Sequence, residues 1–189
     1  MTAVISSGRS GIATFPRMAT PSPYRTLIPE RRVALVLYAL RTTPEARERY
    51  VQRLVKRGGG FRAATLRTWP VDRLAREVVR VRAEDSQDEL DLLQLLYVDL
   101  EPAIQVTFLD AAGVEHADGK ISEDLEPPYA DASSVRRAAD VVLDKHGDDG
   151  ARYLQTLARY SLGWWPEIDL VVNEMASAAP TDTAAAKDR

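Results

Sequence analysis

Cysteine is absent from this chain of 189 residues, and histidine occurs only twice. The chain therefore has no disulfide, no thiol nucleophile, no iron–sulfur ligand and no cysteine-bound zinc. We expect a fold that depends on its hydrophobic core alone. The absence of cysteine also suits a reducing compartment, and we predict a cytoplasmic location.

Long apolar runs are absent too. The longest covers residues 33–40, far short of the ~20 residues that span a bilayer, so we predict no membrane association. The motifs GxGxxG, GxxxxGK[ST], GxSxG and HExxH are also missing. Their absence weighs against an enzyme, and we expect no cofactor.

Each sign of charge is scarce in one half of the chain. Residues 1–82 contain 17 Lys and Arg against 5 acids, whereas residues 83–189 contain 8 against 23. The net charge of −3 therefore hides two opposed blocks. Either the acids at 84–91 and 115–126 cover the arginines of the second to fourth helices, or a protein partner or nucleic acid covers them.

The strongest local patterns are helical. Apolar residues at helical spacing follow Pro29, and Thr43-Pro44 has the form of an N-cap and first residue of a second helix. A basic helix follows over residues 70–82. Ser86 and Glu89 have the spacing of a capping box, which predicts the start of a central buried helix over 87–98.

The segment 103–121 fits two structures. Helical neighbours favour a helix that ends at Gly113, whereas the alternation of Ile104, Val106 and Phe108 would suit a strand of a hairpin. Three amphipathic helices close the chain, and the first of these should end at Gly147.

These patterns predict an all-α, single-domain bundle of about eight helices. The ordered domain should cover residues 28–176, with a basic sub-bundle at 28–83 and an acidic one at 84–176. We expect a disordered arm at 1–27 and a disordered tail at 177–189. The arm has several Ser, Thr and Arg but no acid, so an organelle-targeting segment is the alternative.

Arginines provide the first candidate interaction surface. Arg73, Arg76 and Arg80 fall on one face of the basic helix. Arginine suits bidentate contacts with carboxylates or phosphates. No aromatic residues are interleaved for base stacking, which favours a protein partner over nucleic acid.

Two adjacent tryptophans, Trp164 and Trp165, lie at a joint between helices. Adjacent side chains point in different directions, so one ring could enter the core while the other remains at the surface as a contact residue. The alternative is that both rings fasten the joint.

Acidic residues suggest two less favoured sites. His116 and Asp118 lie in an acid-rich segment that could hold a metal ion, although the spacing fits no calcium loop. Asp91 and Asp99 are two turns apart in an apolar stretch. They form either a carboxylate pair on one wall, or separate groups that face solvent or pair with arginines of the first half.

Together these features favour a non-enzymatic protein-interaction or regulatory module, with a protein partner or a second copy of the chain as its ligand. Two alternatives stay open. One is a nucleic-acid-associated protein that uses the arginine-rich first half. The other is a metal-dependent enzyme that uses the acidic loop around His116.

Overall fold

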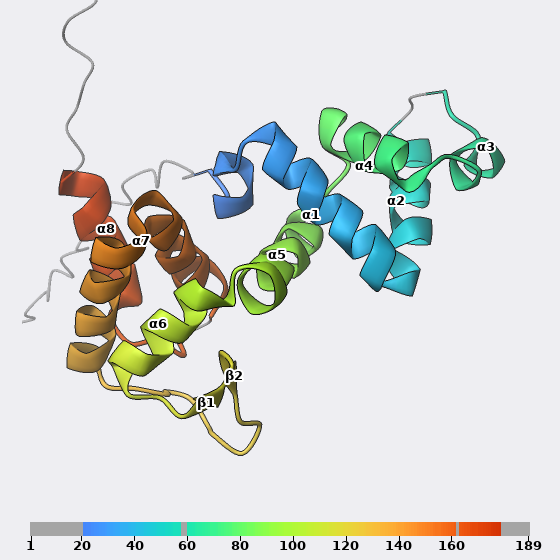
Figure 1. Cartoon of the computed structure of the whole chain (residues 1–189). Coiled ribbons are helices and arrows are strands. Elements are labelled where there is room, and N and C mark those ends of the chain that lie inside the picture. Colours follow the sequence, from blue (N-terminus) through green and yellow to red (C-terminus); the bar gives the residue numbers. More distant parts are fainter. Residues whose placement is uncertain (1–20, 58–59, 162, 179–189) are drawn as a thin grey trace, which may run out of the picture.

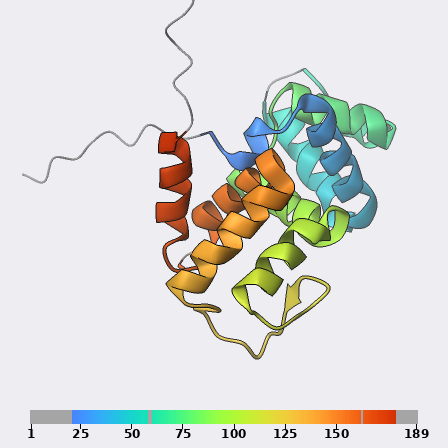
Figure 2. The same ribbon diagram turned by 60° about the vertical axis from the view of Figure 1, so that its left-hand side comes forward.

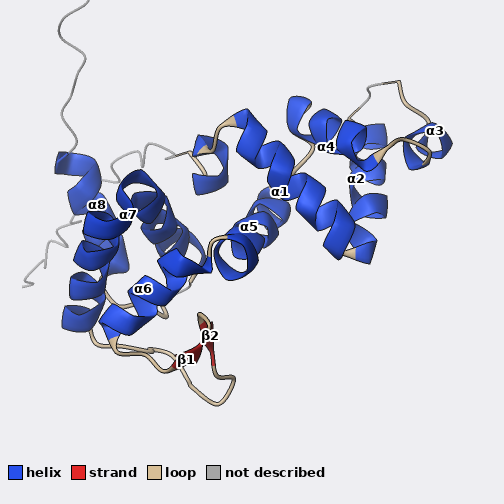
Figure 3. Cartoon of the chain, viewed as in Figure 1, coloured by secondary structure: helices blue, strands red, loops and turns tan. Residues whose placement is uncertain are grey.

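The computed structural model describes residues 21–57, 60–161 and 163–178, which form helices and one very short hairpin (Figures 1 and 3). The predicted all-α class is confirmed. In chain order the elements are the 3-10 helix η1 (Pro23–Thr26), α1 (Pro29–Thr42), α2 (Pro44–Lys56), α3 (Ala63–Arg67), α4 (Val71–Arg80), α5 (Ser86–Gln94), the π-helix η2 (Leu95–Leu100), α6 (Pro102–Ala112), β1 (His116–Ala117), β2 (Lys120–Ile121), α7 (Ala132–Tyr160) and α8 (Ile168–Ala178).

Helix α1 is the centre of the first group of helices and packs against α2 and α4. Prolines occupy the first positions of α1 and α2, where a missing N–H costs no hydrogen bond. Thr43 is the N-cap residue of α2, as predicted, but its side chain makes no capping hydrogen bond. Helix α4 buries Leu74, Ala75 and Val78, and its arginines therefore lie on the outer side.

Helices α6, α7 and α8 form the second group, with α7 packed between the other two (Figure 2). The predicted break at Gly147 is confirmed, because its dihedral angles (φ 53°, ψ −126°) divide α7 into two helical segments. At Gly150 a Cβ atom would lie 2.6 Å from the carbonyl oxygen of Val142. The two segments of α7 can pack this closely only because residue 150 has no side chain.

Helix α5 and the π-helix η2 connect the two groups. Helix α1 contacts both of them, and η2 contacts α6. Leu92, Leu93, Leu96 and Tyr97 are buried here, which confirms the prediction of a central buried helix. The buried apolar side chains of the described residues form one connected cluster that runs through both groups.

Three boundaries differ from the predictions. The segment before Ile28, predicted as disordered arm, instead contains η1, with Tyr24 and Leu27 buried. Helix α8 continues two residues past the predicted end at 176. The N-cap of α5 is Asp85 rather than Ser86, and the capping box is formed with Asp88 rather than Glu89. An aspartate at the N-cap accepts the same backbone hydrogen bonds as a serine, so the capping box can form one residue earlier than predicted.

The ambiguous segment 103–121 is resolved in favour of the helix. Helix α6 ends at Gly113, which adopts the left-handed conformation (φ 75°). The hairpin that follows is much shorter than the alternative, with only two residues in each strand. The predicted disorder at residues 1–20 and 179–189 lies outside the described residues, as does Leu162.

Candidate functional site

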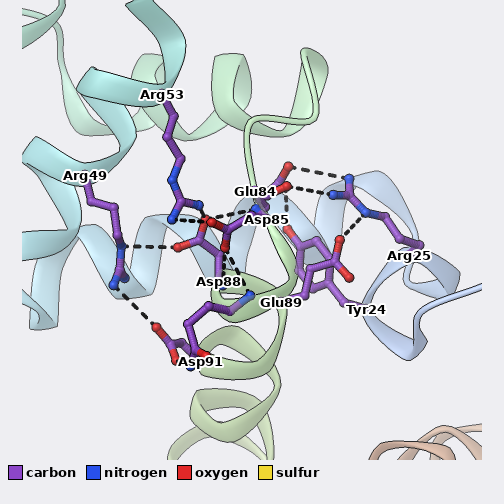
Figure 4. A network of polar contacts seen from close by, with 10 residues as sticks. Tyr24, Arg25, Arg49, Arg53, Glu84, Asp85, Asp88, Glu89 and Asp91 are labelled. Atoms are coloured by element: carbon purple, nitrogen blue, oxygen red, sulfur yellow. Dashed lines mark hydrogen bonds and ion pairs between the residues drawn. The ribbon is translucent and has the colours of Figure 1, made fainter. Parts of the chain in front are cut away.

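The two charge blocks meet at the N-terminus of α5 (Figure 4). Asp88, whose side chain is fully buried, lies between Arg49 and Arg53 of α2. Its Oδ1 is 3.2 Å from Arg49 Nε, and its Oδ2 pairs with Arg53. Arg53 also lies 2.8 Å from Asp85, and Arg49 lies 3.4 Å from Asp91. We call this cluster the α2–α5 junction. Each of its two arginines is shared between two carboxylates.

A second cluster lies beside the junction and joins η1 to the same turn of α5 (Figure 4). The hydroxyl of Tyr24 donates a hydrogen bond of 2.7 Å to Glu84, and Arg25 Nε donates one of 2.5 Å to Glu89. Burial, and then the negative charge of Glu84, raise the pKa of Tyr24 well above its usual range. Tyr24 therefore remains a neutral donor to a carboxylate that is 2% exposed.

A third cluster joins α1 to the second group of helices. Arg31 donates a hydrogen bond of 2.8 Å to Asp149 of α7 and also pairs with Glu101, at the end of η2. Asp149 pairs in addition with Arg152. Burial acts to raise the pKa of Asp149, but the hydrogen bonds from Arg31 and Arg152 outweigh it and hold the pKa below its usual range.

These clusters confirm one half of the predicted charge compensation. Acids at 84–91 pair with arginines of α2, as expected, and Arg25 of η1 joins them. Within the described residues, the acids at 115–126 make no ion pair with an arginine of the first four helices. The arginines of α3 and α4 likewise do not reach the acidic half of the described chain.

The arginines of α4 stay on the surface, on one face, as predicted. We call Arg73, Arg76 and Arg80 the α4 arginine face. The guanidinium of Arg73 lies 3.8 Å from the ring centre of Trp69, and Arg80 makes a 2.5 Å pair with Glu77. The hydrogen bond from Arg80 lowers the pKa of Glu77. Arg76 has no ion pair with any carboxylate among the described residues.

The two tryptophans are split between the core and the surface. Trp165 is 4% exposed and packs edge-on against Phe108, with ring centres 4.9 Å apart. Trp164 is 44% exposed and meets the edge of Tyr129. This confirms that one ring enters the core, and it leaves Trp164 as the exposed candidate. Its neighbours α7 and α8 lie at the opposite end of the molecule from α4 (Figures 1 and 2).

The proposed metal ligands have structural roles. The backbone N–H of Gly119 donates to Nδ1 of His116, so Nε2 carries the proton and donates to Asp110, at 3.1 Å in each case. Both ring nitrogens are thus occupied. Asp118 and Gly119 have positive φ values, as a two-residue hairpin turn requires. In the described part of the chain, no group of three or more metal-binding side chains comes together.

A cleft of about 420 Å³ lies between the α1–α2 joint and the wall formed by α5 and η2. Asp91 and Asp99 both line it, which confirms that the two carboxylates share one side. Asp91 pairs with Arg49, as the second interpretation expected, whereas Asp99 is exposed. Sequence patterns did not reveal this cleft, because its other wall comes from residues about 50 positions earlier in the chain.

Comparison of the chain with known proteins found no matching family model, no matching curated protein and no matching solved structure. Of the described helices, none is by itself long and apolar enough to cross a membrane. One pair meets that criterion only when taken together, Ser86–Leu100 with Pro102–Ala112, and it is bent by 82°.

Proposed function

We propose that this protein is a non-enzymatic protein-interaction module that docks through the α4 arginine face onto an acidic surface of a partner protein. The observation that carries the proposal is the different use of arginines in the two regions. Arg25 of η1, Arg31 of α1, and Arg49 and Arg53 of α2 pair with carboxylates in the acidic half of the same chain. By contrast, Arg73 and Arg76 pair with no carboxylate among the described residues.

The local charge supports an acidic partner. Residues 56–82 contain eight Lys and Arg against two acids. The guanidinium of Arg73 lies over the ring of Trp69, so less side-chain entropy is lost when it binds a carboxylate. The face from Arg73 to Arg80 extends about 10 Å along the helix, since each residue adds about 1.5 Å. That length suits two or three carboxylates of a protein surface.

Glu77 favours a protein over nucleic acid. It lies within the arginine face, at helical spacing from both Arg73 and Arg80, and it bonds to Arg80. A carboxylate in this position repels phosphates but can accept a hydrogen bond from a lysine or arginine of a mixed-charge protein surface. The aromatic neighbour Trp69 is only 8% exposed, so it offers no face for base stacking.

The test uses two variants with the same loss of charge. Arg73→Gln/Arg76→Gln removes two cations from the α4 arginine face and leaves the Arg80–Glu77 pair intact. Lys120→Gln/Arg137→Gln removes two exposed cations far from α4, one on β2 and one on α7. Proteins retained by each purified chain from lysate of its source cells are compared at about 50 and about 300 mM salt.

We expect the wild type and the control to retain one protein in stoichiometric amount at the lower salt, and the α4 variant to lose it. The same variants are tested against labelled duplex DNA and RNA. Tight nucleic-acid binding that falls steeply with salt and vanishes in the α4 variant would replace this proposal with the nucleic-acid alternative. Equal retention by all three chains would refute it.

A further inference from the structure

The cleft beside the α2–α5 junction has the size and lining of a small-molecule site. Its volume of about 420 Å³ lies in the usual range of roughly 300–1,000 Å³. One wall contains Ala39 and Thr43 at the end of α1, together with Arg49 and Tyr50 of α2. The facing wall is formed by six residues of α5 and η2, two of them acidic, namely Asp91, Leu92, Gln94, Leu95, Val98 and Asp99.

The π-helix shapes this facing wall. The N–H of Glu101 bonds to the carbonyl oxygen of Leu96, five residues earlier, at 2.7 Å. A wider turn of this kind costs hydrogen-bond geometry and is found mostly where function requires a helix to place side chains differently. Here η2 contributes Leu95, Val98 and Asp99 to the lining.

The charged side chains that line the cleft determine which ligand charge it favours. Arg49 is already engaged by two carboxylates, Asp88 and Asp91. Asp91 also accepts a hydrogen bond of 2.8 Å from Gln87, so both of its oxygens are occupied. Asp99 is exposed and makes no hydrogen bond or ion pair with any residue that the structure describes. A free carboxylate at the cleft, with the one arginine neutralised, favours a cation and disfavours an anion.

The remaining lining residues suit the apolar body of a ligand. Leu92, Leu95 and Val98 give the cleft apolar surface. Tyr50 is fully buried, and its hydroxyl has no hydrogen-bond partner in the described chain. That hydroxyl is enclosed by protein atoms, so Tyr50 supports the wall of the cleft without offering a polar contact to a ligand.

We propose that this cleft binds a small organic amine, with its ammonium group on the Asp99 carboxylate and its apolar body between Leu95 and Val98. The site is separate from the α4 arginine face. The amine would therefore be a ligand of the module in addition to its protein partner, and loss of one site leaves the other in place.

The test compares three probes of similar shape and different charge: 2-phenylethylamine, 2-phenylethanol and 3-phenylpropanoate. Binding to the purified full-length chain is followed by NMR shifts of the leucine and valine methyl groups. We expect the ammonium probe to bind roughly two- to fivefold more tightly than the alcohol, as for an exposed ion pair. The carboxylate probe should bind most weakly.

Two variants locate the site. Asp99→Asn should reduce the ammonium probe to the affinity of the alcohol, whereas the control Asp144→Asn, an exposed acid on α7, should leave it unchanged. Tyr50→Phe should leave the affinity for all three probes unchanged, because the hydroxyl that it removes is enclosed behind the wall of the cleft. Arg73→Gln/Arg76→Gln should bind the amine like the wild type, even where it fails to bind the protein partner.

Three results would overturn the proposal. They are the absence of shifts at Leu92, Leu95 and Val98, equal affinity for the ammonium and carboxylate probes, and an unchanged affinity after Asp99→Asn. Circular dichroism of each variant shows whether it is folded. If Asp99→Asn is unfolded, the ranking of the three probes on the wild type decides the question alone.

Discussion

Arginines of α2 and arginines of α4 come from the same basic block and end in opposite environments. Arg49 and Arg53 are 34% and 22% exposed and lie against Asp88, whereas Arg80 is 68% exposed and its nearest carboxylate is on its own helix. Charge density along the sequence is similar in both regions. The fold therefore decides which cations hold the protein together and which remain available to a partner.

The cause of this difference is the position of the acids of α5. Carboxylates at a helix N-terminus are stabilised by the helix dipole, but a buried one such as Asp88 also needs a cation. Helix α2 presents Arg49 and Arg53 to that turn. Helix α4 packs on α1 instead and buries Leu74 and Val78, whereas its arginines face outward.

The largest expected effect comes from Asp88→Asn. The amide keeps the size of the side chain but leaves Arg49 and Arg53 without their shared charge in a buried position. Because both arginines still reach water, we expect a loss of about 2–3 kcal/mol in the free energy of unfolding, at or below the usual range for broken buried pairs. Urea denaturation followed by circular dichroism measures it.

The matched change on α4 is Glu77→Gln, which breaks the pair with Arg80 within one helix; the Arg80 side chain is 68% exposed and that of Glu77 is 13% exposed. It should cost no more than about 1 kcal/mol, because the cation of this pair reaches water. Equal costs for the two variants would mean that the α2–α5 junction is no more important to the fold than a surface pair. The contrast between the two regions would then be wrong.

A smaller effect is expected from Tyr24→Phe, which removes the hydrogen bond to Glu84. Loss of a bond to a buried carboxylate should cost about 1.5–3 kcal/mol, and the lower part of this range applies because Arg25 also contacts Glu84. Tyr50→Phe is the control. The Tyr50 hydroxyl is equally buried but unbonded, so its removal should change stability by less than about 0.5 kcal/mol. Equal losses would contradict this assignment.

Local patterns predicted most of the helices but few of the contacts between them. Prolines at helix starts, the break at Gly147 and the spacing of apolar residues depend on neighbours in the sequence, so the fold class could be derived. Arg25 could not be assigned to its cluster, because it lies in a segment that resembles a disordered arm. Its partners Glu84 and Glu89 come about 60 residues later.

The candidate site was predictable in kind rather than in detail. Opposed charge blocks indicated internal pairing, and the spacing of Arg73, Arg76 and Arg80 indicated one exposed face. The π-helix and the cleft were not predictable, because a wider helical turn has no local signature in Leu95 to Leu100. Which tryptophan enters the core depends on whether Phe108 of α6 lies beneath it.

Lowering the pH tests the contributions of two carboxylates to stability, Glu48 in an outer ion pair and Asp149 in an inner one. Hydrogen bonds from Arg67 and Gln52 lower the pKa of Glu48 to about 2, and bonds from Arg31 and Arg152 overcome burial to lower that of Asp149. Both pKa values are depressed on folding. The stability that each carboxylate contributes is therefore present above its unfolded pKa of about 4 and is lost as the pH falls through the folded value.

Salt distinguishes the two carboxylates. Glu48 and its partner Arg67 are 52% and 50% exposed, so the contribution of Glu48 should vanish in about 0.5 M NaCl. Asp149 is 42% exposed, but its partners Arg31 and Arg152 are only 25% and 16% exposed, so its contribution should fall less. Urea midpoints of Glu48→Gln and Asp149→Asn, measured from about pH 2 to 6 at low and high salt, test this. If salt removes both contributions equally, the cluster of Arg31, Asp149 and Arg152 behaves as a surface network. The α2–α5 junction would then be the one set of inner ion pairs in this comparison.

The smallest effect on stability should come from Arg76→Gln, and this variant sharpens the comparison most. Arg76 is exposed and has no carboxylate partner in the described chain, so its loss should change the free energy of unfolding by less than about 0.5 kcal/mol. Arg53→Gln, the matched change on α2, removes a partner of Asp88 and should cost several times more. Urea denaturation of both variants measures the difference. A cost for Arg76→Gln as large as that for Arg53→Gln would show that α4 uses its arginines for folding, and no cation of that face would then be left for a partner.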